Sequence, residues 1–241
     1  MPAPLPSVSS AERSGTALLS AAGLACRRGE RLLFRGLDFA IAPGQVLWLR
    51  GANGRGKTSL LRLLAGLSTP EAGEVRWAGL RLQRNAASLD RLVYIGHANG
   101  LKDDLTVLES LRFLARIHGR PCSPQALDDA LDNLGLRSRR TAPIRTLSQG
   151  QRRRVALARL ALDLTLDALP SLWILDEPYD ALDAQGITTL DTLLSAQARR
   201  GGGVVLTSHL PLNLRDPEPI LLQLDALSPA TPTRDPAFTP A

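Results

Sequence analysis

The sequence predicts an α/β fold with three parts: a mostly parallel sheet core, an antiparallel β part and an inserted helical subdomain. Two observations lead to this prediction. Short apolar runs bounded by turn residues alternate with stretches of helical spacing along most of the chain. Between residues 100 and 145 leucines recur at steps of three and four, which is typical of helices. With 241 residues, 44% of them hydrophobic, the chain is long enough to bury a sizeable core.

The predicted elements follow one another along the chain. Residues 17–27 and 31–41 suggest two strands joined by the turn Arg28-Gly29-Glu30, which gives the antiparallel part. Further apolar runs and helical spacing predict strands at 46–49, 74–78, 92–95, 171–175 and 204–206, and helices at 59–64 and 187–199.

We expect one main domain at 17–225, with the helical subdomain inserted at about 97–165. Thr106 followed by Glu109 fits a capping box that opens the first helix of this insertion. The ends of the chain, 1–16 and 226–241, are rich in Pro and small or hydroxyl residues, and we expect them to be disordered tails.

The charge balance leaves several partners open. Lys and Arg number 29 and Asp and Glu 23, a net charge of +6 that suits a nucleotide, a nucleic acid or an anionic lipid. Aromatic residues are only 4% of the chain, so the aromatic platforms of single-strand binders are missing. Most of the arginines, including the clusters 137–140 and 152–154, are best explained as solvated surface.

The two cysteines and the hydropathy of the chain bear on where the protein works. Cys26 and Cys122 are far apart and form no C-x-x-C, which argues against a disulfide scaffold or a zinc site and fits a reducing compartment. No apolar stretch approaches the roughly 18–20 residues of a membrane span. The first residues also lack the pattern of a secretory signal, so we expect contact with a membrane only through partners.

The strongest motif is a glycine-rich loop. Residues 51–58 read GANGRGKT, which matches G-x-x-x-x-G-K-S/T, and they lie between a predicted strand and a predicted helix. Such a loop directs backbone N–H groups and a helix dipole at phosphate, Lys57 adds a point charge, and Thr58 offers a hydroxyl to Mg²⁺. The predicted nucleotide-binding residues here are Gly51, Asn53, Gly54, Gly56, Lys57, Thr58 and Ser59.

Two adjacent carboxylates follow the apolar strand 171–175. Asp176 at the strand end is predicted to hold Mg²⁺ together with Thr58. Glu177 is predicted to polarise the attacking water as general base. Taken alone, the pair could be a solvated turn, but together with Lys57 it predicts hydrolysis of a nucleoside triphosphate.

Residues 147–151 read LSQGQ ahead of the Asp-Glu strand, and at this point the sequence resembles the ATP-binding cassette (ABC) family. The resemblance implies an ABC-type phosphate-loop fold, ATP hydrolysis with Mg²⁺, and a homodimer that sandwiches the nucleotide. In that dimer Ser148, Gly150 and Gln151 would bind the γ-phosphate held by the other subunit. Ser148 and Gln151 also fit a capping box, and the two interpretations are compatible.

The resemblance covers about residues 17–225. Ala181-Leu182-Asp183 is similar to the family's D-loop, which crosses the dimer interface. His209, at the end of the strand 204–207, corresponds to the histidine that bonds the γ-phosphate and helps to orient the water.

Two positions depart from the family pattern. His97 stands where the family supplies a Gln to Mg²⁺ and to the attacking water, and imidazole titrates near neutrality as Gln does not. Arg28 stands where an aromatic side chain usually stacks on adenine, and a guanidinium plane can also stack on a purine. The choice of ATP over GTP therefore rests on the resemblance.

Within the family, the strings YIGHANGLK at 94–102 and LWILDEP at 172–178 resemble the ATPase subunits of cytochrome c maturation exporters, the CcmA type. The resemblance implies a peripheral subunit on the cytoplasmic face of the inner membrane, docked on integral membrane subunits of the CcmB and CcmC kind. Its ATP hydrolysis would be linked to delivering haem to a periplasmic haem chaperone. The three histidines (His97, His118, His209) are scattered and C-x-x-C-H is missing, so we do not predict haem binding by this chain.

Three alternatives stay open. The chain could serve a different ABC exporter or importer. It could be a soluble ABC protein acting on ribosomes or DNA. Such proteins usually carry two cassettes or a long coiled coil, for which 241 residues leave no room, so we do not expect nucleic acid as a partner. It could also be a regulatory module that binds nucleotide without hydrolysis, against which the intact Lys57, Asp176 and Glu177 argue.

Overall fold

The computed structural model describes residues 17–82, 91–120, 122–165 and 171–225, and the predicted tails lie outside these ranges. The strands are β1 (Leu19–Arg28), β2 (Arg31–Ile41), β3 (Val46–Arg50), β4 (Ala72–Trp77), β5 (Leu80–Arg81), β6 (Leu92–Ile95), β7 (Leu172–Leu175), β8 (Gly203–Thr207) and β9 (Ile220–Gln223). The helices are α1 (Lys57–Leu64), α2 (Val107–Ile117), α3 (Pro124–Asn133), α4 (Gln149–Leu164) and α5 (Ala184–Arg199), with 3-10 turns at Arg137–Arg139 and Ile144–Thr146.

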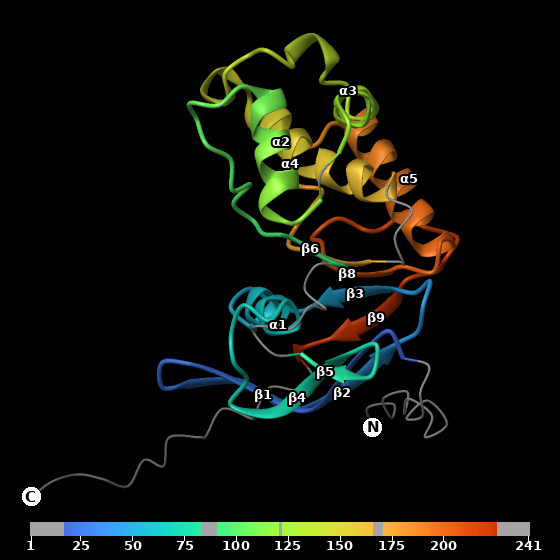
Figure 1. Ribbon diagram of the computed structural model, residues 1–241. Helices are drawn as coiled ribbons and strands as arrows, with labels where there is room; N and C mark the ends of the chain where they lie inside the picture. Colours follow the sequence, from blue (N-terminus) through green and yellow to red (C-terminus); the bar gives the residue numbers. More distant parts are fainter. Residues whose placement is uncertain (1–16, 83–90, 121, 166–170, 226–241) are drawn as a thin grey trace, which may run out of the picture.

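The strands form two sheets. In the antiparallel sheet the order is β2-β1-β4-β5, and in the central sheet it is β6-β7-β8-β3-β9 with every pair parallel. Helices α2 to α5 lie on one side of the central sheet, and α1 and the antiparallel sheet lie on the other side (Figure 1). The predicted α/β fold, with its parallel core and antiparallel part, is confirmed.

The central sheet is buried on both faces because successive side chains of a strand point to opposite sides. In β7, Trp173 and Leu175 enter the core beneath the helices, whereas Leu172 and Ile174 enter the core shared with α1 and the antiparallel sheet. All four side chains are fully buried. This double burial explains why the strand is a continuous apolar run rather than an alternating one.

Side-chain caps start α2, α3 and α4, and those of α2 and α4 were predicted from the sequence. Thr106 and Glu109 form the complete capping box at α2, and Ser148 and Gln151 form another at α4. The hydroxyl of Ser123 accepts the N–H of Ala126 at the start of α3. Each cap satisfies an N–H group that the helix cannot pair internally.

The strands β5 and β9 were not predicted. β5 has only two residues, too few for a periodic pattern. β9 pairs with β3 at the edge of the sheet, where Ile220 and Leu221 stay exposed, so its position depends on strand pairing rather than on a buried face. The helices α2, α3 and α4 lie within the segment 97–165, but the domain boundaries stay a prediction.

Candidate functional site

Four loops meet at one edge of the central sheet. Because the strands are parallel, their carboxyl ends share this edge, which is where α/β folds bind ligands. The loop 51–56 leaves β3, Asp176-Glu177 leaves β7, Ser208-His209 leaves β8 and Gly96-His97 leaves β6. Segments far apart in the sequence are thereby brought to one place.

The glycine-rich loop leads directly into α1. Gly56 is the N-cap residue with φ 96°, a left-handed conformation, and a Cβ there would lie 3.1 Å from Cβ of Leu33. Lys57 begins the helix, and its Nζ donates a hydrogen bond to the carbonyl oxygen of Gly51 at 2.8 Å. The ammonium group is thus held against the first residue of the loop.

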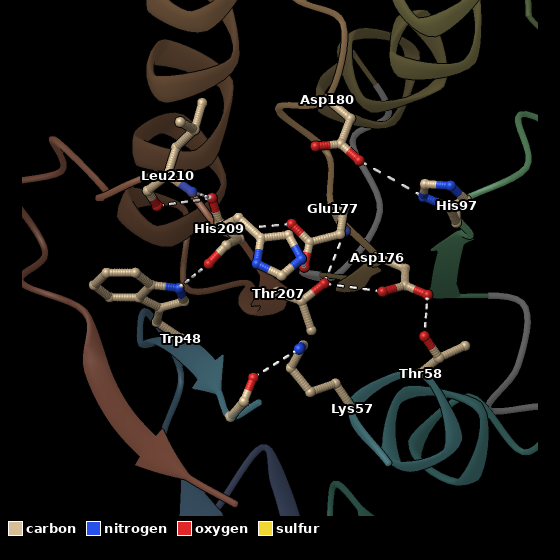
Figure 2. Close-up of polar contacts among 12 residues, drawn as sticks. Trp48, Lys57, Thr58, His97, Asp176, Glu177, Asp180, Thr207, His209 and Leu210 are labelled. Atoms are coloured by element: carbon tan, nitrogen blue, oxygen red, sulfur yellow. Dashed lines mark hydrogen bonds and ion pairs between the residues drawn. The ribbon is translucent and has the colours of Figure 1, made fainter. Parts of the chain in front are cut away.

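A chain of hydrogen bonds joins three of these segments (Figure 2). Thr58 Oγ1 donates to Asp176 Oδ2 at 2.8 Å, and Thr207 Oγ1 donates to Asp176 Oδ1 at 2.9 Å. Thr207 Oγ1 in turn accepts the backbone N–H of Glu177 at 2.8 Å. The N–H of His209 donates to Glu177 Oε2 at 3.0 Å. The two carboxylates are therefore fixed relative to α1 and to the loop after β8.

Glu177 has an unusual backbone and a nearly buried side chain. Its φ of 47° is rare for a residue with a side chain, and such strain is typical of functional sites. The residue is 8% exposed, and Oε1 lies 3.5 Å from His209 Nε2. Among the described residues Oε1 has no hydrogen-bond partner, so this oxygen can accept a proton.

The loop that carries His209 is held by β3. Trp48 Nε1 donates to the carbonyl oxygen of Ser208 at 3.4 Å, and the guanidinium of Arg50 lies 4.8 Å from the centre of the Trp48 ring. Figure 2 shows the imidazole of His209 beside the Glu177 carboxylate.

Most of the predicted site residues line a single open pocket. They are Arg28, Asn53, Gly54, Gly56, Lys57, Thr58, Ser59, His97, Asp176, Glu177 and His209. Gly51 lines an adjoining pocket, together with Lys57 and His209. The fold therefore brings the glycine-rich loop, the carboxylates and the histidine together, which is the geometry that binding and cleaving a phosphate chain requires.

The donor set at the end of the loop fits Mg²⁺. This ion is usually bound by one or two carboxylates and by substrate phosphates, and it keeps several waters. The hydroxyl of Thr58 and the buried carboxylate of Asp176 supply such oxygens 2.8 Å apart. Within the described ranges, no group of three or more His, Cys, Asp or Glu side chains is arranged as a metal-binding cluster.

Comparisons with known proteins agree with this geometry. The model of the ABC transporter family matches residues 34–180, more than half of the chain. The chain belongs to the ABC transporter family. It also shares 51% identity over 198 residues with the cytochrome c biogenesis ATP-binding export protein CcmA of Methylococcus capsulatus, covering 82% of this chain and 93% of that protein.

Further relatives place the chain in the same branch of the ABC family. The CcmA protein of Pseudomonas putida GB-1 is 53% identical over 194 residues, which cover 79% of this chain and 89% of the relative. The CcmA protein of Cupriavidus necator is 44% identical over 231 residues, covering 94% and 98%. The prediction of a CcmA-type ABC ATPase that binds ATP and hydrolyses it for transport is confirmed.

Solved structures show the same ABC fold. An ABC transporter ATP-binding protein from Pyrococcus furiosus superposes with a TM-score of 0.73 at 23% identity, covering 88% of this chain and 99% of that one. The ATP-binding subunit of another ABC transporter gives a TM-score of 0.70 at 26% identity and covers 80% of each chain. In the described part of this chain, no helix has the length and apolar character needed to cross a bilayer.

The ABC signature residues lie apart from this pocket. Ser148, Gly150 and Gln151 stand at the N-terminal end of α4, and none of them is among the described residues that line the pocket. A Cβ on Gly150 would lie only 2.6 Å from the carbonyl oxygen of Ala181, so the helix start packs directly on the turn after β7. Among the described residues, the signature therefore does not line the pocket that contains the glycine-rich loop.

His97 and Arg28 lie at the margin of the pocket. The side chain of His97 is 75% exposed, and its Nδ1 lies 3.6 Å from Asp180 Oδ2. Arg28 ends β1 and is also exposed. Both residues line the pocket, whereas the role of His97 in metal binding and that of Arg28 in base stacking stay predictions.

Sequence reasoning missed three residues of the site. Thr207 was predicted only as part of a strand, although a polar residue at the carboxyl end of a buried strand is a usable signal. Asp180 lines the pocket and was not singled out. The expectation that most of the arginines are solvated does not hold for Arg153, which is only 3% exposed. Helical spacing could have revealed this, since Arg153 precedes the buried Leu157 by four positions on α4.

Proposed function

We propose that Glu177 is the general base that activates water for ATP hydrolysis. The observation that supports this role most is Oε1 of a nearly buried carboxylate, which has no hydrogen-bond partner among the described residues and lies in the same pocket as Lys57. The N–H of His209 holds Oε2, which leaves Oε1 to receive the proton of water. The His209 ring, 3.5 Å from Oε1, is assigned to orient that water and the γ-phosphate.

Lys57 and the loop around it are proposed to bind the phosphate chain. Gly51, Asn53, Gly54, Gly56 and Ser59 contribute N–H groups or close backbone approach, and Lys57 balances the negative charge. On leaving Gly51, the ammonium group would exchange one carbonyl oxygen for phosphate oxygens.

Thr58 and Asp176 are proposed to hold Mg²⁺, with His97 at the rim of the same site. When bound, the ion would neutralise charge on the phosphates. Arg28 is assigned to stack on the base, because a planar guanidinium can lie against a purine.

The signature residues are proposed to complete the site of a second copy. Ser148, Gly150 and Gln151 open α4, whose N-terminal N–H groups and dipole favour an anion. Their separation from the pocket of their own chain supports a head-to-tail homodimer with ATP between the two copies.

We further propose that the dimer drives the haem export step of cytochrome c biogenesis. The names of the relatives as cytochrome c biogenesis export proteins support this assignment. The chain would act on the cytoplasmic face of the inner membrane, bound to integral membrane subunits of the CcmB and CcmC kind.

Glu177→Gln tests the base assignment. The amide keeps the shape of the side chain but does not take up the proton, so we expect kcat to fall by about 10²-fold or more while ATP still binds. A phosphate-release assay measures turnover, and size-exclusion chromatography in ATP measures the trapped dimer. Turnover close to that of the parent would show that Glu177 is not the base.

A further inference from the structure

Arg153 lies beneath the candidate site and contacts two of its loops. It is 3% exposed, and all three guanidinium nitrogens donate hydrogen bonds. The acceptors are the peptide oxygens of Asp176 (2.8 Å), Glu177 (2.7 Å), Pro178 (3.2 Å) and Gly96 (3.0 Å) and the side-chain oxygen of Asn99 (3.0 Å). One side chain of α4 thereby joins the turn after β7 to the loop after β6.

The turn after β7 needs such a support. Glu177 has φ 47°, and a strained backbone persists only where the surroundings hold it. Thr207 holds its N–H from one side, and Arg153 holds three consecutive carbonyl oxygens from the other. The direction of the Glu177 carboxylate depends on the conformation that these contacts fix.

The acceptor pattern requires an arginine. A guanidinium is planar and presents five donors in a fixed fork, whereas an ammonium presents three donors around one point. The acceptors belong to two loops and lie around the whole fork, so a lysine could reach only part of them. Arg153 does not line the pocket itself, so it acts through other residues.

We propose that Arg153 is a positioning residue for ATP hydrolysis, which fixes the Glu177 turn and the loop 96–99 to the helix that carries the signature. The inference goes beyond the assignment of Glu177 as base and rests on it. Because the guanidinium is attached to α4, the position of this helix also sets the position of the carboxylate.

The test compares Arg153→Lys and Arg153→Gln in the full-length chain, in the complex in which it is purified. We expect kcat for ATP hydrolysis to fall at least about tenfold, since small misplacements of catalytic groups cost one to two orders of magnitude. We expect KM and the affinity for a fluorescent ATP analogue to stay within about threefold, because the five hydrogen bonds of Arg153 go to the loops after β6 and β7 and not to the glycine-rich loop. Lys keeps the charge and tests the geometry even if the Gln variant does not fold.

Two further variants separate positioning from stability. Arg200→Gln removes another arginine with buried contacts, one that pairs with Asp163 away from the pocket. It should lower Tm but leave kcat of the folded protein within about twofold of the parent. Asn99→Ala removes a single acceptor on the loop and should lower kcat by about threefold with Tm nearly unchanged.

Three outcomes would overturn the inference: kcat within about twofold of the parent in both Arg153 variants, an equal loss of nucleotide affinity, or the same loss of kcat in Arg200→Gln. Glu177→Gln in the same assay distinguishes the two proposals. If that variant keeps its turnover, the base assignment fails; if it loses turnover and Arg153→Lys does not, only the positioning role fails.

Discussion

At the residue scale, the side chain of Thr207 forms hydrogen bonds with two neighbours in the site. Thr207 is fully buried and donates to Asp176 while accepting the N–H of Glu177. A single hydroxyl thus satisfies two buried polar groups, each of which would cost about 1–3 kcal/mol if left unpaired. The proposed metal ligand and the proposed base are fixed by the same atom.

His118 gives a test at the residue scale. It caps the C-terminal end of α2 and lines a small pocket with Arg120 and Arg159. Desolvation by the surrounding atoms, followed by the charges of Arg159 and Arg120, lowers the pKa of His118 to about 4, although part of the residue stays exposed to solvent. Because its ordinary pKa is 6.5, the unfolded chain binds more protons between these two values, and the free energy of unfolding falls as the pH falls through this window.

His118→Gln should therefore lose less stability than the parent between about pH 7 and pH 5. The measurement is Tm by thermal unfolding across this range, with the difference above pH 7 as the baseline for the substitution itself. An equal decline of Tm with falling pH in the two proteins would show that His118 does not contribute to the pH dependence of stability.

At the scale of elements, a buried carboxylate joins α4, β7 and α5. Asp163, 3% exposed at the end of α4, accepts from Trp173 Nε1 at 2.7 Å and from Arg200 Nη2 at 2.6 Å. It also contacts Ser171 and Arg120. The arginines and the indole N–H surround the charge of Asp163, so the packing of each of these elements depends on the same carboxylate.

Asp163→Asn should lower the free energy of unfolding by about 3 kcal/mol, because it removes the buried charge that Arg120 and Arg200 contact. Denaturant unfolding measures the change. Asp128→Asn is the matched control: it breaks the exposed contact of Asp128 with Arg140 and should cost less than about 0.5 kcal/mol. A similar small cost for both variants would contradict the assignment of Asp163 as a structural centre.

At the scale of the whole molecule, each proposed composite site needs parts of two chains. Lys57→Ala removes the ammonium group from one part, and Gly150→Ala places a Cβ 2.6 Å from the Ala181 carbonyl oxygen and disturbs the other. In a mixed dimer the Gly150→Ala chain supplies an intact glycine-rich loop, and the Lys57→Ala chain supplies an intact signature.

The two variants are co-expressed with different affinity tags, and mixed dimers are isolated through both tags. These mixed dimers should hydrolyse ATP, although each variant alone is expected to be inactive. One of two sites is intact, so the rate should reach at most about half that of the parent dimer. Doubly tagged parent dimers serve as the positive control. Mixed dimers as inactive as the single variants would argue against the head-to-tail arrangement.

Several residues of the site could be predicted from the sequence because local chemistry specifies them. Lys57 and Thr58 complete a motif whose spacing is fixed by one turn and one helix start. Asp176 and Glu177 follow a short apolar run that is typical of a buried strand and forms one. These predictions needed no knowledge of what lies nearby in space.

Arg153 and β9 show what local patterns do not contain. The sequence places Arg153 among other arginines, and only the packing of α4 on the loops after β6 and β7 gives it five acceptors. β9 forms because the chain returns beside β3, far away in sequence. Such contacts depend on the tertiary fold of the whole chain.

The α/β class, the glycine-rich loop, two of the helix caps and the identity of the carboxylates can be inferred from the sequence, because each depends on neighbours along the chain. The contacts of Thr207 and Arg153 with the strained Glu177 turn, and the absence of the signature residues from the lining of the pocket, are visible only in the folded chain. The reason is physical: hydrogen bonds and burial act over a few ångströms in space, whatever the separation in sequence.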